Sequence, residues 1–215
     1  MTRITVLGGT GYTGANLLRA AVARGHDVTS YSRNPPEAPI DGVRYETGSL
    51  SDEGVRTAAV QGADVVVGAL SAKAGLGGDI AAVYGRIAEA AAAAGARLGV
   101  VGGYSSLRPA SGAPRFSEGD DLPPQFAAEA KAMAAVVDLL QAEAPAGLDW
   151  FFISPAMVYG AFAPGERIGS YRLGDDVALQ RDGGPTTISG ADFADAVLDE
   201  IETPTHHRAH FSAAQ

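Results

Sequence analysis

Two spacings of apolar residues alternate along the chain, and each predicts a different kind of element. Short runs rich in β-branched residues are typical of buried strands, whereas apolar residues three and four positions apart are typical of amphipathic helices. Strands are expected at residues 4–7, 27–31, 43–47, 64–70, 98–101 and 148–153, with shorter pieces at 170–173 and 209–212. Helices are expected at residues 12–24, 51–61, 79–94, 126–144 and 191–202.

The regular alternation of strands and helices up to residue 153 indicates the fold class. Strand–helix–strand units cross over with a right hand and build a parallel sheet with helices on both faces. Two segments rich in proline, glycine and serine, 103–125 and 154–190, interrupt this pattern. Loops of that length are commonly functional. We therefore expect a single α/β domain over residues 1–215, with 103–125 as a functional loop and 154–190 as a small C-terminal lobe.

Composition and charge exclude several classes of function. The 215 residues are 46% hydrophobic and 19% charged, which is typical of a compact protein. The net charge of −9 disfavours nucleic acid and anionic membranes as partners. Without cysteine there is no disulfide scaffold, thiolate metal site or cysteine nucleophile. No secretory signal or apolar stretch of about 20 residues is evident, so a cytoplasmic location is expected.

The clearest chemical signal is the glycine-rich stretch directly after the first predicted strand. It reads Gly-Gly-Thr-Gly-Tyr-Thr-Gly over residues 8–14, which fits both GxxGxxG and GxGxxG spacing. Glycine tolerates the backbone angles of a sharp strand-to-helix turn and leaves room for a diphosphate against the main chain. The following helix then offers free N–H groups and a partial positive charge. The position between strand and helix favours a dinucleotide-binding turn over a tight turn without a ligand.

The residue at the end of the second strand indicates which dinucleotide is bound. An NAD site usually places a carboxylate about 20 residues past the glycines. Here Arg33 occupies that place, 19 residues after Gly14, and the next carboxylate is Glu37. An arginine can hold a 2′-phosphate through charge-assisted hydrogen bonds. NADP(H) is therefore the expected cofactor and NAD(H) the alternative, with a solvated loop cation as the competing interpretation of Arg33.

Several further stretches match a known family. They are VLGGTGYTG at 6–14, RGHDV at 24–28, SRNP at 32–35 and LDWFFISPA at 148–156, and most specifically PGERIGSYRLGD at 164–175 and ISGADFA at 188–194. Together they cover nearly the whole chain. The sequence resembles the atypical short-chain dehydrogenase/reductases, in particular the NADH-flavin reductase group close to the NmrA-like proteins and biliverdin reductase B. The resemblance implies a Rossmann-like, doubly wound sheet that binds NADP(H) or NAD(H) and passes a hydride to a flavin or similar acceptor.

The resemblance also implies which residues contact the cofactor. Gly48-Ser49-Leu50 matches the place where relatives carry Gly-Asp-Leu against the adenine, with serine in place of the aspartate. The segment 154–156 matches the stretch beside the nicotinamide. The implied contacts are Gly8, Thr10, Gly11, Tyr12, Thr13, Gly14, Arg33, Ser49, Leu50, Ala69, Leu70, Ser71, Ser154, Pro155 and Ala156.

Candidates for handling the acceptor follow the fifth strand. The Tyr-xxx-Lys pair of typical short-chain dehydrogenases is missing, because Ala127 precedes Lys131 by four residues and Ala88 follows Tyr84 by four. A flavin or quinone has its own electron sink, so positioning supplies much of the catalysis. Ligands of open α/β sheets bind at the carboxyl ends of strands, which points to Tyr104, Ser105 and Ser106. Capping of a loop by these residues is an equally good interpretation.

Other chemically suggestive side chains are given structural interpretations. His206, His207 and His210 lack a second set of ligands and are expected to be exposed in a C-terminal tail, so no metal site is expected. Glu166 and Arg167 could line the acceptor site or pair with each other.

Two functions fit these observations. The first is an NAD(P)H-dependent reductase of a flavin, quinone or conjugated carbonyl, with FMN or FAD as a substrate and a monomeric or homodimeric state. The second is an NmrA-like sensor that binds the dinucleotide without catalysis. The missing Tyr-xxx-Lys pair fits both, and the short chain favours the reductase.

Overall fold

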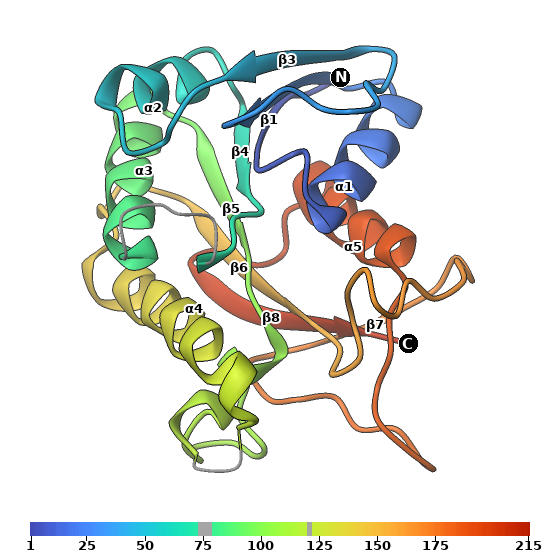
Figure 1. The fold of residues 1–215 in the computed structure, drawn as a ribbon. Coiled ribbons are helices and arrows are strands. Elements are labelled where there is room, and N and C mark those ends of the chain that lie inside the picture. Colours follow the sequence, from blue (N-terminus) through green and yellow to red (C-terminus); the bar gives the residue numbers. More distant parts are fainter. Residues whose placement is uncertain (73–78, 120–121) are drawn as a thin grey trace.

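A computed structural model describes residues 1–72, 79–119 and 122–215 (Figure 1). In this part of the chain, eight strands form one sheet with the order β3-β2-β1-β4-β5-β6-β8-β7. Strands β1 to β6 and β8 run parallel, whereas β7 is antiparallel to β8. The strands are β1 (Arg3–Leu7), β2 (Asp27–Ser32), β3 (Val43–Thr47), β4 (Val65–Gly68), β5 (Arg97–Val101), β6 (Trp150–Pro155), β7 (Arg172–Gly174) and β8 (Ala209–Ala214).

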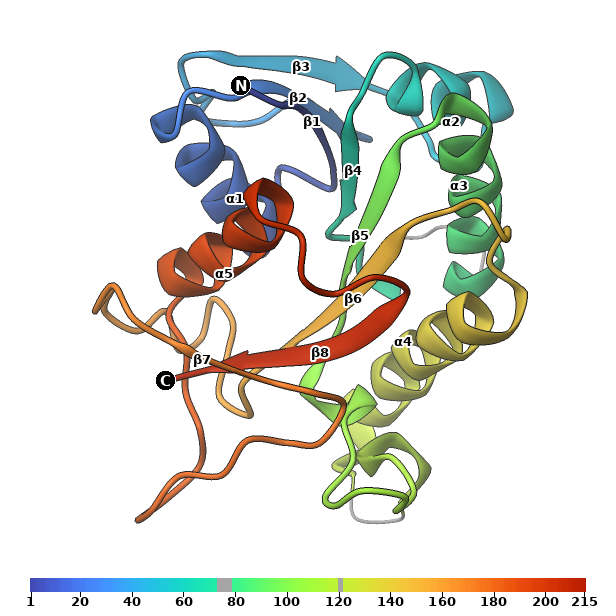
Figure 2. The same ribbon diagram turned by 180° about the vertical axis from the view of Figure 1, so that it is seen from behind.

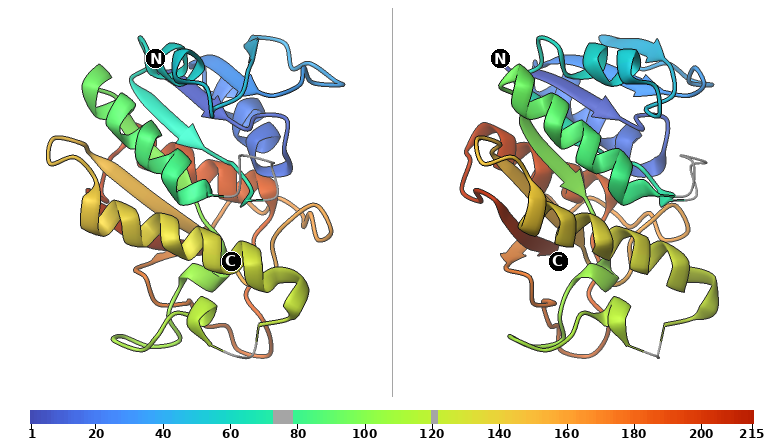
Figure 3. Two further views of the ribbon diagram at one scale, coloured as in Figure 1. Left: turned by 60° about the vertical axis from the view of Figure 1, so that its left-hand side comes forward. Right: turned by 90° about the vertical axis from the view of Figure 1, so that its left-hand side faces the viewer.

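Helices cover both faces of the sheet, as expected for a doubly wound fold. Helices α1 (Tyr12–Ala23) and α5 (Gly190–Glu202) lie side by side on one face (Figure 2). Helices α2 (Glu53–Val60), α3 (Ile80–Ala94) and α4 (Pro124–Glu143) cover the other face (Figure 3). Each layer buries its own apolar cluster, one around Phe151, Phe193 and Phe211 and the other around Tyr84 and Trp150. The Rossmann-like α/β prediction is confirmed.

The elements begin and end where local chemistry predicts. Asp52 caps α2 by accepting a hydrogen bond from the Val55 amide at 3.1 Å, and Ser189 caps α5. Helix α3 ends at Gly95, whose left-handed φ of 69° disfavours other residues. Helix α4 begins at Pro124, two residues earlier than predicted, since proline is well suited to the first turn.

Several strand boundaries differ from the sequence prediction, most clearly those of β4, β6, β7 and β8. Strand β6 covers Trp150–Pro155 rather than 148–153. Strand β4 covers only Val65–Gly68 of the predicted 64–70, because the chain turns away from β1 after Gly68. Strand β7 is Arg172–Gly174 rather than 170–173, and β8 continues to Ala214 because β7 pairs with its end.

The sheet order fixes the place of the binding crevice. The chain proceeds from β1 outward through β2 to β3, then crosses back so that β4 lies on the other side of β1. The connections after β1 and β4 therefore leave in opposite directions, and a crevice opens at the carboxyl ends of these two strands. Val6 lies opposite Val67 in this pair, and Leu7 opposite Gly68.

The two long segments of the sequence meet at the carboxyl end of the sheet. Segment 103–125 contains the short helices η2 (Tyr104–Ser106) and η3 (Phe116–Glu118) and the start of α4. Arg108 in this segment forms a parallel bridge to Val177 in the other segment, and its guanidinium pairs with Asp176 at 2.9 Å. The structure therefore joins the predicted functional loop to the C-terminal lobe. No helix in the described residues is long and apolar enough to cross a membrane.

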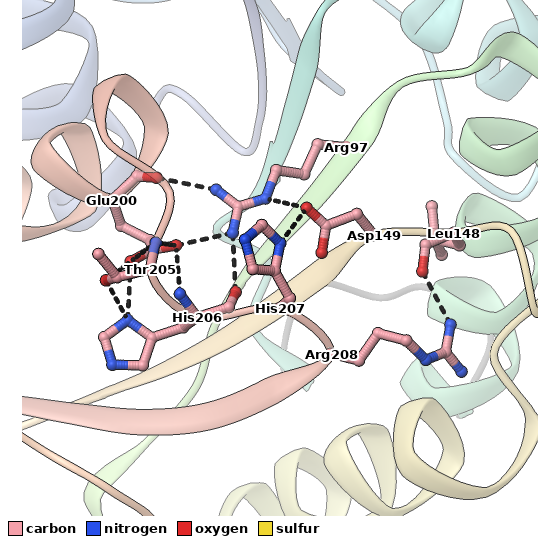
Figure 4. A network of polar contacts seen from close by, with 8 residues as sticks. All are labelled: Arg97, Leu148, Asp149, Glu200, Thr205, His206, His207 and Arg208. Carbon is pink, nitrogen blue, oxygen red and sulfur yellow. Dashed lines mark hydrogen bonds and ion pairs between the residues drawn. The ribbon is translucent and has the colours of Figure 1, made fainter.

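A network of hydrogen bonds and ion pairs holds the amino end of β8 in place (Figure 4). The C-terminal histidines were expected to be exposed, and the structure differs for two of them. The ring of His206 stacks on Phe211 with centroids 3.9 Å apart, and its Nδ1 lies 2.7 Å from Glu200 Oε2. His210 is buried in β8. His207 alone is exposed, and it pairs with Asp149. The expectation was wrong for His206 and His210 because β8 joins the sheet beside β6 and is not a free tail.

Glu200 is the centre of this network. Its side chain is 2% exposed, and Oε1 receives a hydrogen bond from Arg97 Nη2 at 2.7 Å. Burial alone would raise the pKa of Glu200, but hydrogen bonds from Arg97, His206 and Thr205 outweigh it and lower the pKa to about 2. The folded protein therefore stabilises the ionised carboxylate relative to the unfolded chain.

We expect Glu200→Gln to lower the free energy of unfolding at neutral pH by about 3 kcal/mol, because the buried guanidinium of Arg97 loses a charged partner. Since the folded pKa of Glu200 lies below its ordinary value of 4.5, its contribution is complete above that value and is lost as the pH falls toward 2. Chemical denaturation of wild type and variant between pH 7 and pH 3 measures both effects, and the difference between them should shrink with acidification.

Glu202→Gln provides the matched control. Glu202 belongs to the same helix and pairs with Arg24 and His26, but its side chain is 36% exposed. An exposed pair contributes about 1 kcal/mol or less. Equal losses in the two variants would contradict the role assigned to Glu200.

Candidate dinucleotide site

The turn between β1 and α1 is built from the main chain alone. Gly8 has a left-handed φ of 87°, and its carbonyl accepts the Gly11 amide at 3.1 Å. A Cβ on Gly14 would lie 2.3 Å from the Gly8 oxygen, so only glycine permits this approach. Gly11 caps α1 without a side-chain hydrogen bond, and no acidic residue occupies the first turn. The amino end of α1 therefore keeps N–H groups and a positive field available for an anion.

A cleft with a volume of about 210 Å³ opens in front of this turn. The ends of four neighbouring strands meet there, as the sheet order requires. The glycine turn forms part of the cleft wall, so a diphosphate in the cleft could approach the main chain closely. It is lined by Gly8, Thr10, Gly11, Tyr31, Ser32, Arg33, Gly48, Leu50, Ala69, Leu70 and Ser71.

Arg33 lies at the cleft on the exposed turn that follows β2. Ser32 Oγ donates to the Asn34 carbonyl at 2.9 Å and so shapes this turn. Within the described residues, no hydrogen bond or ion pair involves the Arg33 side chain. The guanidinium is therefore available to an anionic group in the cleft.

Only part of the segment predicted to contact the adenine lines the cleft. Leu50 is buried and lines the cleft, whereas Ser49 is exposed and is absent from the cleft wall. Ser49 Oγ instead accepts the Ser51 amide at 3.3 Å. Arg56, which is 8% exposed, donates from Nη1 to the Leu50 carbonyl at 2.9 Å and supports this segment from α2.

Tyr12 and Thr13 face the C-terminal lobe rather than the cleft. Tyr12 donates from its hydroxyl to the Pro164 carbonyl at 3.1 Å, and Thr13 Oγ1 lies 2.8 Å from the Tyr159 hydroxyl. Burial raises the pKa of Tyr159, so its hydroxyl stays protonated. The two residues, which were predicted to contact the cofactor, thus connect the start of α1 to the lobe through hydrogen bonds.

Glu129 of α4 is a site neighbour that the sequence did not reveal. Its Oε1 accepts from Ser71 Oγ at 2.8 Å and from the Ala72 amide at 2.9 Å. The end of the cleft after β4 is thereby attached to α4. A glutamate within a helical pattern carries no local signal of such a contact, because its partners are 57 and 58 residues away.

The residues predicted beside the nicotinamide are buried at the end of β6. Ser154, Pro155 and Ala156 all have buried side chains. Ser154 Oγ lies 2.9 Å from His210 Nε2.

The acceptor candidates after β5 lie on η2. The ring of Tyr104 stacks on Phe116 with centroids 5.0 Å apart, and burial raises the pKa of its hydroxyl. Ser105 is half-buried and Ser106 is 1% exposed. Ser106 Oγ has no hydrogen-bond partner in the described part of the chain.

A second cavity of about 550 Å³ lies within the C-terminal lobe. Its wall is mainly apolar, with Val158, Ile168 and Ile188, and Glu166 and Arg181 supply charge. Glu166 therefore lines this cavity, and whether it faces the acceptor stays a prediction. Arg167 does not pair with it and instead binds Asp195 at 2.8 Å.

Asp192 of α5 holds the loop beside this cavity. The carboxylate is fully buried and accepts the Ile168 amide at 3.0 Å and the Gly169 amide at 2.8 Å. Burial opposes ionisation, but hydrogen bonds from Ser189 and these amides outweigh it and hold the pKa of Asp192 below its usual range. Within residues 1–72, 79–119 and 122–215, no group of three or more acidic or histidine side chains could hold a metal ion.

Comparison with known proteins places the chain in a dinucleotide-binding family. The family model described as NAD(P)H-binding matches residues 8–204. The chain is 31% identical to the uncharacterized protein YwnB of Bacillus subtilis, covering 98% of this chain and 97% of that protein. A solved structure from Burkholderia pseudomallei, named “Putative exported protein”, is 34% identical, with a TM-score of 0.87 and full coverage of both chains. A “putative NADH-flavin reductase” from Streptococcus pneumoniae TIGR4 is 26% identical, with a TM-score of 0.84 and full coverage of both.

The fold and the cleft define an NAD(P)H-binding protein of the Rossmann type, and the chain belongs to the NAD(P)H-binding family. Within it, the protein is an atypical short-chain dehydrogenase/reductase, and a nicotinamide dinucleotide is its cofactor.

Proposed function

We propose that this protein transfers a hydride from NADPH to a flavin, a quinone or a related conjugated carbonyl compound. The observation that carries the proposal is the cleft that both the glycine turn and Arg33 line. The name of the Streptococcus pneumoniae relative supports an acceptor of the flavin type. When bound, the dinucleotide supplies the hydride.

The chain's own residues bind and orient the dinucleotide. The main-chain amides of Gly9 and Thr10 and the amino end of α1 would hold the diphosphate, since the amides of Gly8 and Gly11 already donate to the Tyr31 and Gly8 carbonyls. Leu50 offers an apolar wall to the adenine, and Arg33 offers a bidentate cation to the 2′-phosphate. This arrangement favours NADPH over NADH.

The acceptor side supplies positioning rather than a strong acid. Tyr104 keeps its hydroxyl protonated because burial raises the pKa, so it can donate a hydrogen bond to an acceptor oxygen or nitrogen. The chain lacks the Tyr-xxx-Lys pair that lowers a tyrosine pKa in typical relatives. A conjugated acceptor fits this site because it delocalises the incoming charge itself.

The decisive experiment follows NADPH oxidation optically with FMN, riboflavin and a simple quinone as separate acceptors. We expect turnover with at least one of them, because the acceptor provides the electron sink that the protein lacks. Calorimetry with NADPH is performed on the same preparation.

If the protein binds NADPH tightly but no acceptor oxidises it, the reductase proposal is wrong and the function as a dinucleotide sensor is favoured. No heat with either NADPH or NADH at millimolar concentration would contradict dinucleotide binding altogether. A cytoplasmic, monomeric or homodimeric reductase remains our proposal for the setting of this activity.

A further inference from the structure

Three buried polar side chains, those of Arg115, His210 and Ser154, form a hydrogen-bonded series on the acceptor side of the site. The series extends from the loop 103–125 to the end of β6. Arg115 is 2% exposed, His210 is 6% exposed and Ser154 is fully buried. Arg115 Nη1 lies 3.3 Å from His210 Nδ1, and His210 Nε2 lies 2.9 Å from Ser154 Oγ. The ring of His210 meets Phe152 edge-on, with centroids 4.9 Å apart. Three segments remote in sequence are thereby joined by hydrogen bonds.

The partners of His210 determine which ring nitrogen carries the proton. A guanidinium only donates hydrogen bonds, so Nδ1 beside Arg115 must present its lone pair. The proton of the neutral ring is then on Nε2, and this nitrogen donates to Ser154 Oγ. Ser154 accepts this bond, and its own hydrogen remains available for a second partner.

His210 orients its neighbours and does not deliver protons. Burial, together with the cation of Arg115, lowers its pKa to about 3, and Arg108 acts in the same direction against Asp176. The ring is therefore neutral at physiological pH and lacks the second proton of a general acid. Its contribution is a fixed donor in a buried position, where hydrogen bonds are stronger than in water.

Arg115 connects this series of side chains to the predicted acceptor-handling residues on η2. The same Nη1 atom donates to the Ser106 carbonyl at 2.6 Å, at the end of η2. Its other nitrogen, Nη2, lies 3.2 Å from Asp138 and 3.2 Å from Gln141, both on α4. The residue after Arg115 is Phe116, on which Tyr104 stacks. One guanidinium thus holds η2 against both α4 and β8.

We propose that Arg115 and His210 are positioning residues that hold Tyr104–Ser106 on η2 and Ser154 on β6 in fixed relation, and so shape the acceptor half of the site. This inference rests on the proposed function for the identity of the acceptor. It predicts that disturbing the pair changes use of the acceptor and leaves NADPH affinity intact. The dinucleotide cleft contains neither Arg115 nor His210 in its wall.

The proton arrangement is tested without any acceptor. Nitrogen NMR of the ¹⁵N-labelled wild-type protein reports the tautomer of each histidine and its titration. We expect His210 to carry its proton on Nε2 and to remain neutral from pH 8 to pH 5. A proton on Nδ1, or titration of His210 near pH 6.5, would overturn the proposal.

Kinetics of two variants tests the positioning role. His210→Leu removes both hydrogen bonds, whereas His210→Gln keeps a donor that can reach Ser154. We expect His210→Leu to lower kcat/KM for the acceptor about tenfold, with the Kd for NADPH unchanged within about twofold, and His210→Gln to recover most of the loss. His207→Gln is the matched control, since that exposed histidine contacts Asp149 away from the cleft.

A double variant separates positioning from general loss of stability. Ser154→Ala combined with His210→Leu should reduce kcat/KM by less than the product of the two single losses, because both changes break the His210–Ser154 bond, whereas the Arg115–His210 bond is lost only with His210. Wild-type kinetics in His210→Leu, or parallel loss of acceptor use and NADPH binding, would overturn the proposal. A wild-type protein that reduces no acceptor would count against the proposed function, whereas the NMR result is independent of that outcome.

Discussion

Gly14→Ala is expected to lower the free energy of unfolding by about 3 kcal/mol and to weaken NADPH binding about a hundredfold. The added Cβ would lie 2.3 Å from the Gly8 oxygen, 2.7 Å from the Gly9 Cα and 2.9 Å from the Gly8 carbonyl carbon. These are all main-chain atoms, so no side chain can rotate away and the turn itself must open. Opening it moves the amides that would hold the diphosphate. Thermal unfolding and calorimetric titration with NADPH measure the two effects.

Gly11→Ala is the matched control for this variant. A Cβ on Gly11 would lie 3.4 Å from the Gly8 oxygen, an ordinary contact, and the φ of −79° suits alanine. We expect the free energy of unfolding to change by less than about 0.5 kcal/mol. If Gly14→Ala were as stable as Gly11→Ala, the close approach of α1 to the turn could not be what requires glycine.

Arg33→Ala is expected to weaken NADPH binding about ten- to a hundredfold while changing NADH binding less than about threefold. The basis is the loss of a charge-assisted contact to the 2′-phosphate, which contributes about 1.5–3 kcal/mol. Arg33 is exposed and has no hydrogen bond or ion pair in the described residues, so its removal breaks no internal polar contact. Fluorescence titration with both dinucleotides gives the ratio of dissociation constants directly.

Arg19→Ala controls for the loss of one positive charge. Arg19 is an exposed residue of α1 that does not line the cleft. Removing it should weaken NADPH and NADH binding by the same small factor, through the general field of the protein. Equal losses of NADPH and NADH affinity in Arg33→Ala would refute the 2′-phosphate role and favour the interpretation of Arg33 as a solvated cation.

The glycine turn and the position of Arg33 after β2 could be predicted from the sequence because both depend on local features. A strand, a run of glycines and a helix lie within residues 3–23, and Arg33 follows at the end of the next strand. The spacing of the glycines predicts a strand-to-helix turn before any tertiary contact is known. Ala69 and Leu70 after β4, which the family resemblance implied, line the same cleft because parallel strands end at one edge.

Other expectations were wrong, or held for only some of their residues, where contacts with residues distant in sequence determine the position of a side chain. Ser49 matched a family position yet is not part of the cleft wall and accepts the Ser51 amide, while Leu50 beside it lines the wall. His210 was expected in an exposed tail because no local pattern shows that β8 pairs with β6. Glu166 and Arg167 are adjacent, but Asp195 of α5 takes the arginine.

The sequence by itself determined the parallel sheet with helices on both faces and the glycine turn, since apolar periodicity and glycine's conformational freedom act over a few residues. Only the tertiary structure decided that Arg115 reaches His210 and that Arg97 reaches Glu200, across 95 and 103 residues of chain. Such pairs leave no trace in local spacing, because burying a charge is tolerated only where the fold brings its partner close enough to offset the cost of desolvation.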